Sequence, residues 1–178
     1  MGWKNCLLAA VLLAAGTAPA LASGCDTVIT AHVKRLHMPF RSKSVQQHND
    51  NSDELTIEAI NIGDKRYVKM SGVLEGDWSP SARDPGKEDS DYRRLMRSQR
   101  LTCSLEKSEN GAGGMEDVWL TQNSDTDAIE SRTWILQSTG LPMRVETYTG
   151  QNTERPGTNT TTYEYDDVKP PEASPPSP

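Results

Sequence analysis

The stretch Ser131–Tyr148, SRTWILQSTGLPMRVETY, decides how this chain is expected to fold. Its apolar run at 134–136 is followed by Ser138-Thr139-Gly140, a short polar segment that ends in glycine. The chain then returns with Met143 and Val145 two positions apart, the period of a strand with one apolar face. The stretch therefore predicts two antiparallel strands, 131–137 and 141–148, joined by a tight turn.

Short strands separated by turn residues continue on both sides of this hairpin. Apolar residues alternate from Leu55 to Ala59 and change phase at Ile60, which predicts a bulge or a strongly curved strand. Gly63-Asp64 then marks a hairpin turn. Further strands are expected at 41–47, 65–70, 101–107, 115–121 and 159–168, with a polar loop at 72–86 that contains Trp78.

Two segments have helical rather than strand periodicity. Apolar residues recur three and four apart over 26–38, and Tyr92, Leu95 and Met96 share one face of 89–99. Strands linked by hairpins, with helices before and between them, are typical of an α+β domain. We therefore expect one antiparallel sheet with two or so helices packed on it.

Composition excludes several classes of protein. The chain has 178 residues, of which 34% are apolar and 6% aromatic, and its formal net charge is -6. Such a chain is neither a multi-pass membrane protein, nor a coiled coil, nor a large multidomain enzyme. Because an acidic surface does not attract phosphate backbones, we expect no nucleic-acid partner.

The chain begins with the pattern of an exported protein. Residues 1–22 place Lys4 before an apolar stretch at 7–15, and Ala20-Leu21-Ala22 supplies a small-x-small cleavage site. We expect this signal peptide to be removed, leaving a single domain at 23–168 and a proline-rich, disordered tail at 169–178. Localisation would then be periplasmic or secreted.

Two cysteines remain in the mature chain, Cys25 and Cys103. An even number in an exported protein predicts a disulfide bond between them. However, Ala22-Ser23-Gly24-Cys25 also fits a loose bacterial lipoprotein signal, in which Cys25 would be acylated and Cys103 left free. Membrane contact is expected only in that second case.

Several stretches occur in an order that resembles a known superfamily. Trp134-Ile135 is followed by TGLPMR at 139–144 and by YEYDDVKPP at 163–171. This succession resembles the C-terminal half of exported bacterial proteins of the LolA/LolB-like superfamily, the lipoprotein carriers. It is closer still to a set of small secreted proteobacterial proteins, whose other features match Cys25, Glu58-Ala59-Ile60, Tyr67-Val68, Trp78-Ser79-Pro80 and Thr102-Cys103.

The resemblance implies a curled antiparallel sheet, a half-open barrel, with helices covering its concave face. In carriers of this type the hollow holds acyl chains, so a lipid or a lipoprotein acyl chain is the expected partner. The apolar side chains available for this are Val68, Met70, Leu95, Met96, Trp119, Trp134, Met143 and Val145, with Trp78 as a contact from the loop. The alternative is that these side chains fill a small core.

Motifs for catalysis are absent from the sequence. It has no G-x-S-x-G, phosphate-binding glycine loop, H-E-x-x-H or C-x-x-C, and its carboxylate pairs are neighbours that would point to opposite faces of a strand. We expect no cofactor and no metal site. The sequence thus favours a non-enzymatic binding protein over a cell-envelope interaction module with a filled core, and over a small hydrolase in which His32 or His37 would take part.

Overall fold

The computed structural model describes residues 24–48, 54–72, 76–149 and 157–172. Two helices and nine strands follow one another along the chain. They are α1 (Gly24–Leu36), β1 (Phe40–His48), β2 (Leu55–Ile62), β3 (Lys65–Ser71), β4 (Ser79–Ala82), α2 (Pro85–Ser98), β5 (Leu101–Gly111), β6 (Gly114–Asn123), β7 (Ile129–Leu136), β8 (Leu141–Thr149) and β9 (Gly157–Glu164).

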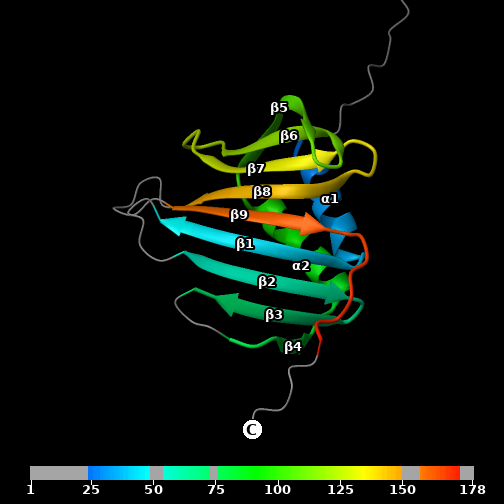
Figure 1. Ribbon diagram of the computed structural model, residues 1–178. Helices are drawn as coiled ribbons and strands as arrows, with labels where there is room; N and C mark the ends of the chain where they lie inside the picture. The colour runs from blue at the N-terminus through cyan, green and yellow to red at the C-terminus, as the bar shows by residue number, and fades with distance from the viewer. Residues whose placement is uncertain (1–23, 49–53, 73–75, 150–156, 173–178) are drawn as a thin grey trace, which may run out of the picture.

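All nine strands form one antiparallel sheet in the order β4-β3-β2-β1-β9-β8-β7-β6-β5 (Figure 1). Each hairpin pairs strands that are adjacent in sequence, and the pairing of β1 with β9 joins the two halves of the sheet. The first and last strands of this order, β4 and β5, do not pair with each other, so the sheet is open. The hairpin predicted from residues 131–148 is β7–β8, in which Leu136 lies opposite Leu141.

Both helices lie on the same side of the sheet (Figure 1). The six buried residues of α1 recur at helical spacing: Val28, Ile29, Ala31, His32, Val33 and Leu36. They meet the half of the sheet that contributes the buried Ile135, Leu136 and Leu141. Much of the hydrophobic core therefore lies between α1 and strands β5 to β8, and Phe40 of β1 and Tyr163 of β9 are buried as well.

The ends of α1 show that the sheet is curved. Nine flat strands would span about 38 Å at about 4.8 Å per strand, whereas thirteen helical residues span about 20 Å. Yet Cys25 in the first turn is bonded to Cys103 of β5, and the Leu36 carbonyl accepts a hydrogen bond from Arg83, which follows β4. Both edges of the sheet therefore bend toward the helices, which confirms the predicted open, curled α+β fold.

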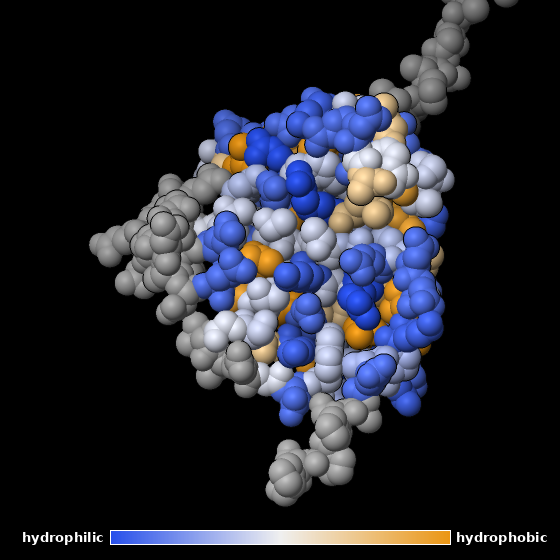
Figure 2. Space-filling model, viewed as in Figure 1, coloured by the Kyte–Doolittle hydropathy of each residue, from blue (hydrophilic) through white to orange (hydrophobic). Residues whose placement is uncertain are grey.

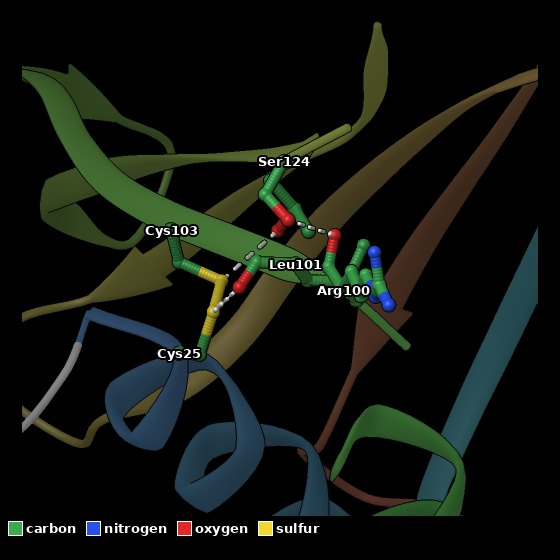
Figure 3. The surroundings of a disulfide bond; sticks show 6 residues. Cys25, Arg100, Leu101, Cys103 and Ser124 are labelled. Carbon is green, nitrogen blue, oxygen red and sulfur yellow. Dashed lines mark hydrogen bonds between the residues drawn. A yellow bond between two sulfur atoms is a disulfide. The ribbon is translucent and has the colours of Figure 1, made fainter. Parts of the chain in front are cut away.

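The disulfide between Cys25 and Cys103 joins α1 to β5 (Figure 3). The helix and the strand approach so closely here that a Cβ on Gly24 would collide with the carbonyl oxygen of Cys103. At the start of the same strand, the amide and hydroxyl groups of Ser124 donate to the Arg100 carbonyl at 2.8 and 3.0 Å. The predicted pairing of the two mature cysteines is thus present.

Some element boundaries differ from the predictions. The expected loop at 72–86 contains β4, which pairs with β3 although its second residue is Pro80, because an edge strand does not need every N–H. Helix α2 begins at Pro85 rather than at 89, since Asp84 caps it by accepting from the Lys87 amide at 3.0 Å. The last strand ends at Glu164 and not at 168.

Of the two structures expected near Ile60, a bulge or a strongly curved strand, the bulge is absent. Strand β2 keeps a continuous register with both neighbours, and Ile60 lies between Arg41 and Tyr67 on the side of the sheet away from the helices. Ile60 is nevertheless only 1% exposed. The apolar pattern therefore changes phase here because side chains on both faces of β2 are buried. Register shifts occur instead in the pairs formed by β5, β6, β7 and β8.

The predicted signal peptide, 1–22, lies outside the described residues. Of the predicted tail, 169–172 is described and contains neither helix nor strand, and 173–178 lies outside. Within the described part of the chain, no helix is long and apolar enough to span a bilayer.

Candidate functional site

One row of side chains crosses the helix-facing side of the sheet. Registered partners on neighbouring strands share a face, so the row can be followed from β3 to β5. Its members are Met70, Ile57, Ser44, Thr161, Val145, Thr133, Trp119 and Leu105. Side chains at its two ends are apolar and open, with Met70 44% and Leu105 51% exposed.

A pair of hydroxyl groups occupies the middle of this row. The Ser44 and Thr161 oxygens lie 2.8 Å apart, and one hydroxyl donates a hydrogen bond to the other. Beyond them, Thr133 is only 1% exposed beneath α1. The row is therefore polar at its centre and apolar on the β2–β3 side.

Helix α2 packs quite differently from α1. None of its fourteen residues, all of which the structure describes, is buried. Glu88 holds the helix to the sheet through Arg66 of β3 at 2.9 Å and through Arg83 at 2.7 Å. Leu95 lies seven residues later on the same helical face, yet it is 52% exposed.

The exposure of Leu95 identifies the open part of the interior. Leu95 shares the helical face of Glu88, which binds Arg66 of β3, and on β3 Val68 is half-buried and Met70 is exposed. The opposite side of the same sheet is largely hydrophilic (Figure 2). Apolar side chains that face a helix and stay open to solvent can bury the apolar part of a ligand.

The contact between the two helices is aromatic and polar. His32 of α1 lies 5.1 Å from Tyr92 of α2, ring centroid to ring centroid. Burial, with a smaller contribution from Arg35, lowers the pKa of His32 to about 3, and burial raises the pKa of Tyr92. Both side chains are therefore neutral near pH 7, and His32 is poorly suited to acid–base chemistry.

His37, the other histidine considered for catalysis, lies at the surface. Its Nε2 is 3.4 Å from the Asp89 carboxylate of α2. His32 lies within α1 and His37 follows its last residue, and neither histidine lines the pockets described below.

Predicted ligand contacts fall into three groups. Val68, Met70, Trp119 and Val145 lie on the helix-facing side of the sheet, and Leu95 and Met96 lie on α2. Trp134 lies on the opposite face, where it is registered between Val118 and Arg144. Trp78 is half-buried just before β4, and Met143 lines the strand-end pockets.

A second surface lies where the strands of the β5–β9 half end. One pocket of about 630 Å³ is formed by Met38, Leu136, Leu141, Met143 and Tyr165, among others. A second, of about 360 Å³, has Glu109, Glu116, Trp134, Arg144 and Thr162 in its lining. Both pockets share Ala112, Met143, Tyr163 and Glu164, so together they form one strand-end groove.

Trp134 is fixed at the polar end of this groove. Its Nε1 donates to Glu109 at 2.7 Å, and the Arg144 guanidinium lies over its ring at 3.7 Å. Lys107 in turn is 2.6 Å from the second Glu109 oxygen. Because these residues come from three different strands, β5, β7 and β8, the sequence showed an apolar strand here and did not indicate the groove.

Comparison with known proteins finds similarity in the fold and none in the sequence. No protein-family model matches this sequence, and no curated protein is significantly similar to it. Among solved structures, it is similar to an uncharacterised conserved protein from Thermus thermophilus, with 12% identity, a TM-score of 0.47 and coverage of 82% of this chain and 90% of that one. It is also similar to MucB in complex with MucA(peri), with 12% identity, a TM-score of 0.46 and coverage of 84% and 59%.

A third similar structure belongs to the superfamily that the sequence resembles. It is a LolA superfamily protein from Nitrosomonas europaea, with 12% identity, a TM-score of 0.34 and coverage of 80% of this chain and 92% of that one. All three identities are low, so what the chain does has to be argued from its own surfaces. The structures similar to this chain thus include one LolA superfamily protein, and the chain's own topology is an open, curled antiparallel sheet with two helices on one side.

Proposed function

We propose that the mature protein is an exported, non-enzymatic binding protein that holds an apolar or acylated ligand between α2 and the helix-facing side of β2 and β3. The observation that carries this proposal is the packing of α2: none of its residues is buried, and Leu95, on the helical face of Glu88 that binds Arg66 of β3, is 52% exposed. Residues Val68, Met70 and Leu95 would form the contact, with Ile57 of β2 beside Met70 on the same face of the sheet. Trp134 is left out of this lining because it lies on the other face.

Export is part of the same proposal. The leader pattern at 1–22 favours it, and a disulfide such as Cys25–Cys103 persists in oxidising compartments. The sulfur of Cys25 is used in that bond, so the structure supports the unanchored form of the protein over the acylated one.

Acyl-chain binding has a specific energetic signature. Each methylene removed from water contributes about 0.8 kcal/mol, which corresponds to about a fourfold gain in affinity. Affinity for fatty acids should therefore rise with chain length until the open apolar surface is filled.

Binding of dansylated undecanoic acid, followed by its fluorescence, tests the proposal. We expect Leu95→Asp to weaken binding by about tenfold or more, because a carboxylate replaces an apolar contact. Met115→Asp is the matched control, since Met115 is 41% exposed at the β5–β6 turn and outside the proposed contact. Equal binding by the Leu95→Asp and Met115→Asp variants, or no binding by the unmodified protein, would contradict the proposal.

A further inference from the structure

The strand-end groove contains a carboxylate, that of Glu116, to which no described residue donates a hydrogen bond. Glu116 of β6 is only 7% exposed, and no described residue forms a hydrogen bond or an ion pair with its side chain. Its carboxyl group lies against Gly111, where a Cβ would collide with it. Since a buried carboxylate without a donor is unfavourable, this position is suited to a ligand that donates hydrogen bonds.

Charges around Glu116 favour a cation. Glu109 is already used by Lys107 and Trp134. Arg144, whose guanidinium lies on the Trp134 ring, attracts Glu116 electrostatically but forms no hydrogen bond with it. Glu164 and Asp166 also line the groove, and no described residue is paired with either carboxylate. The groove therefore has more carboxylates than cations to neutralise them.

The other end of the groove is apolar. Leu136, Leu141 and Met143 line its larger pocket together with Met38 of the segment that follows α1. A ligand that fills both ends would carry a positive group on an apolar stem. The volumes of about 360 and 630 Å³ are those of a site for a small organic molecule.

We propose that the strand-end groove binds a primary ammonium group on an apolar stem, with the ammonium on Glu116 and the stem against Leu136 and Leu141. A primary ammonium has three donors, so it can satisfy the buried carboxylate while its charge is neutralised. This site does not depend on the proposed acyl contact, which uses the other side of the sheet and the β2–β3 half.

Calorimetric titration of the mature protein with n-octylamine tests this assignment. We expect binding that Glu116→Gln weakens by about 10- to 100-fold, the effect of losing one charge-assisted hydrogen bond. Glu130→Gln on β7 removes the same charge outside the groove and should leave binding unchanged. Octyltrimethylammonium, which cannot donate, should bind the unmodified protein as weakly as n-octylamine binds the Glu116→Gln variant.

A second measurement covers the case in which Glu116→Gln does not fold. Octylamine affinity of the unmodified protein should fall as the pH is lowered and Glu116 is protonated, and Leu95→Asp should leave that affinity unchanged. Equal affinity for octylamine and octyltrimethylammonium, or unaltered binding by a folded Glu116→Gln variant, would overturn the ammonium site. Loss of octylamine binding in Leu95→Asp would place the amine at the acyl contact instead and would also overturn it.

Discussion

His32 is a polar side chain enclosed in the contact between α1 and α2. It is 8% exposed, and its Nδ1 finds no hydrogen-bond partner among the described residues. Protonation would place a charge next to Arg35 in a site that water does not reach. The helix contact is therefore stable only while His32 is neutral.

This makes the free energy of unfolding depend on pH. The pKa of His32 is about 3 in the folded protein, against about 6.5 in an unfolded chain. Between these values the unfolded state binds more protons, so stability falls as the pH is lowered. From about pH 7 to about pH 5 the contribution of this one group is about 2 kcal/mol.

Urea denaturation at those two pH values measures the effect. His32→Phe, which keeps a ring against Tyr92, should lose about 2 kcal/mol less stability on acidification than the unmodified protein. The exposed His37→Phe is the control, because it removes a histidine without touching the buried one. A pH dependence of His32→Phe equal to that of the unmodified protein would show that His32 is not buried as described.

At single positions the sequence could predict which side chains are apolar, but not always the face of the sheet on which they lie. Met70 and Val145 lie on the helix-facing side, as alternation predicts. Trp134 is directed to the other face, and the register shift beside it, between Trp134 and Ile135, depends on how β7 pairs with β8. Nothing in the sequence indicated that Glu116 would be buried, because it is buried by contact with Gly111 across the β5–β6 hairpin.

Among the elements, α2 is the one that tertiary contacts hold least. The Glu88 ion pairs and the Asp84 cap fix its first turn, whereas further along the helix Leu95 is 52% exposed and no residue is buried. Local opening is easiest where few apolar contacts are lost. The second half of α2 can therefore separate from the sheet without unfolding the core under α1, as admission of a ligand would require.

Hydrogen exchange measured by mass spectrometry tests this property of α2. We expect amides of 85–98 to exchange faster than those of β7 and β8, and Asp84→Ala to speed exchange in α2 about fivefold, since an N-cap contributes about 1 kcal/mol. Asp125→Ala, which removes an exposed acid outside the helix, should leave α2 unchanged. Protection in α2 equal to that in β7 would exclude the local opening.

Element types were predictable where periodicity was strong. The β7–β8 hairpin and α1 follow directly from apolar spacing, because each buries one continuous face. Strand β4 has no such face, since all four of its residues are exposed. Its pairing with β3 depends on its position at the edge of the folded sheet, which no sequence pattern indicates.

At the scale of the whole molecule, two long-range links define the shape. Pairing of β1 with β9 joins the two halves of the sheet, and the Cys25–Cys103 bond ties its far edge to α1 across 78 residues. The second link was predictable from the cysteine count. The first was not, because β1 and β9 have ordinary polar strand patterns that do not specify a partner.

A single variant distinguishes the two fates that the sequence leaves open for Cys25. In the bridged protein, Cys103→Ser removes the link and should lower the free energy of unfolding by about 4 kcal/mol, the chain-entropy value for a loop of this length. The double variant Cys25→Ser/Cys103→Ser should then be no less stable than the single one. In a protein acylated at Cys25, Cys103→Ser would have little effect, and the intact mass from the native host would include acyl chains. Finding that mass would contradict both the disulfide and the unanchored, exported form on which the proposed function is built.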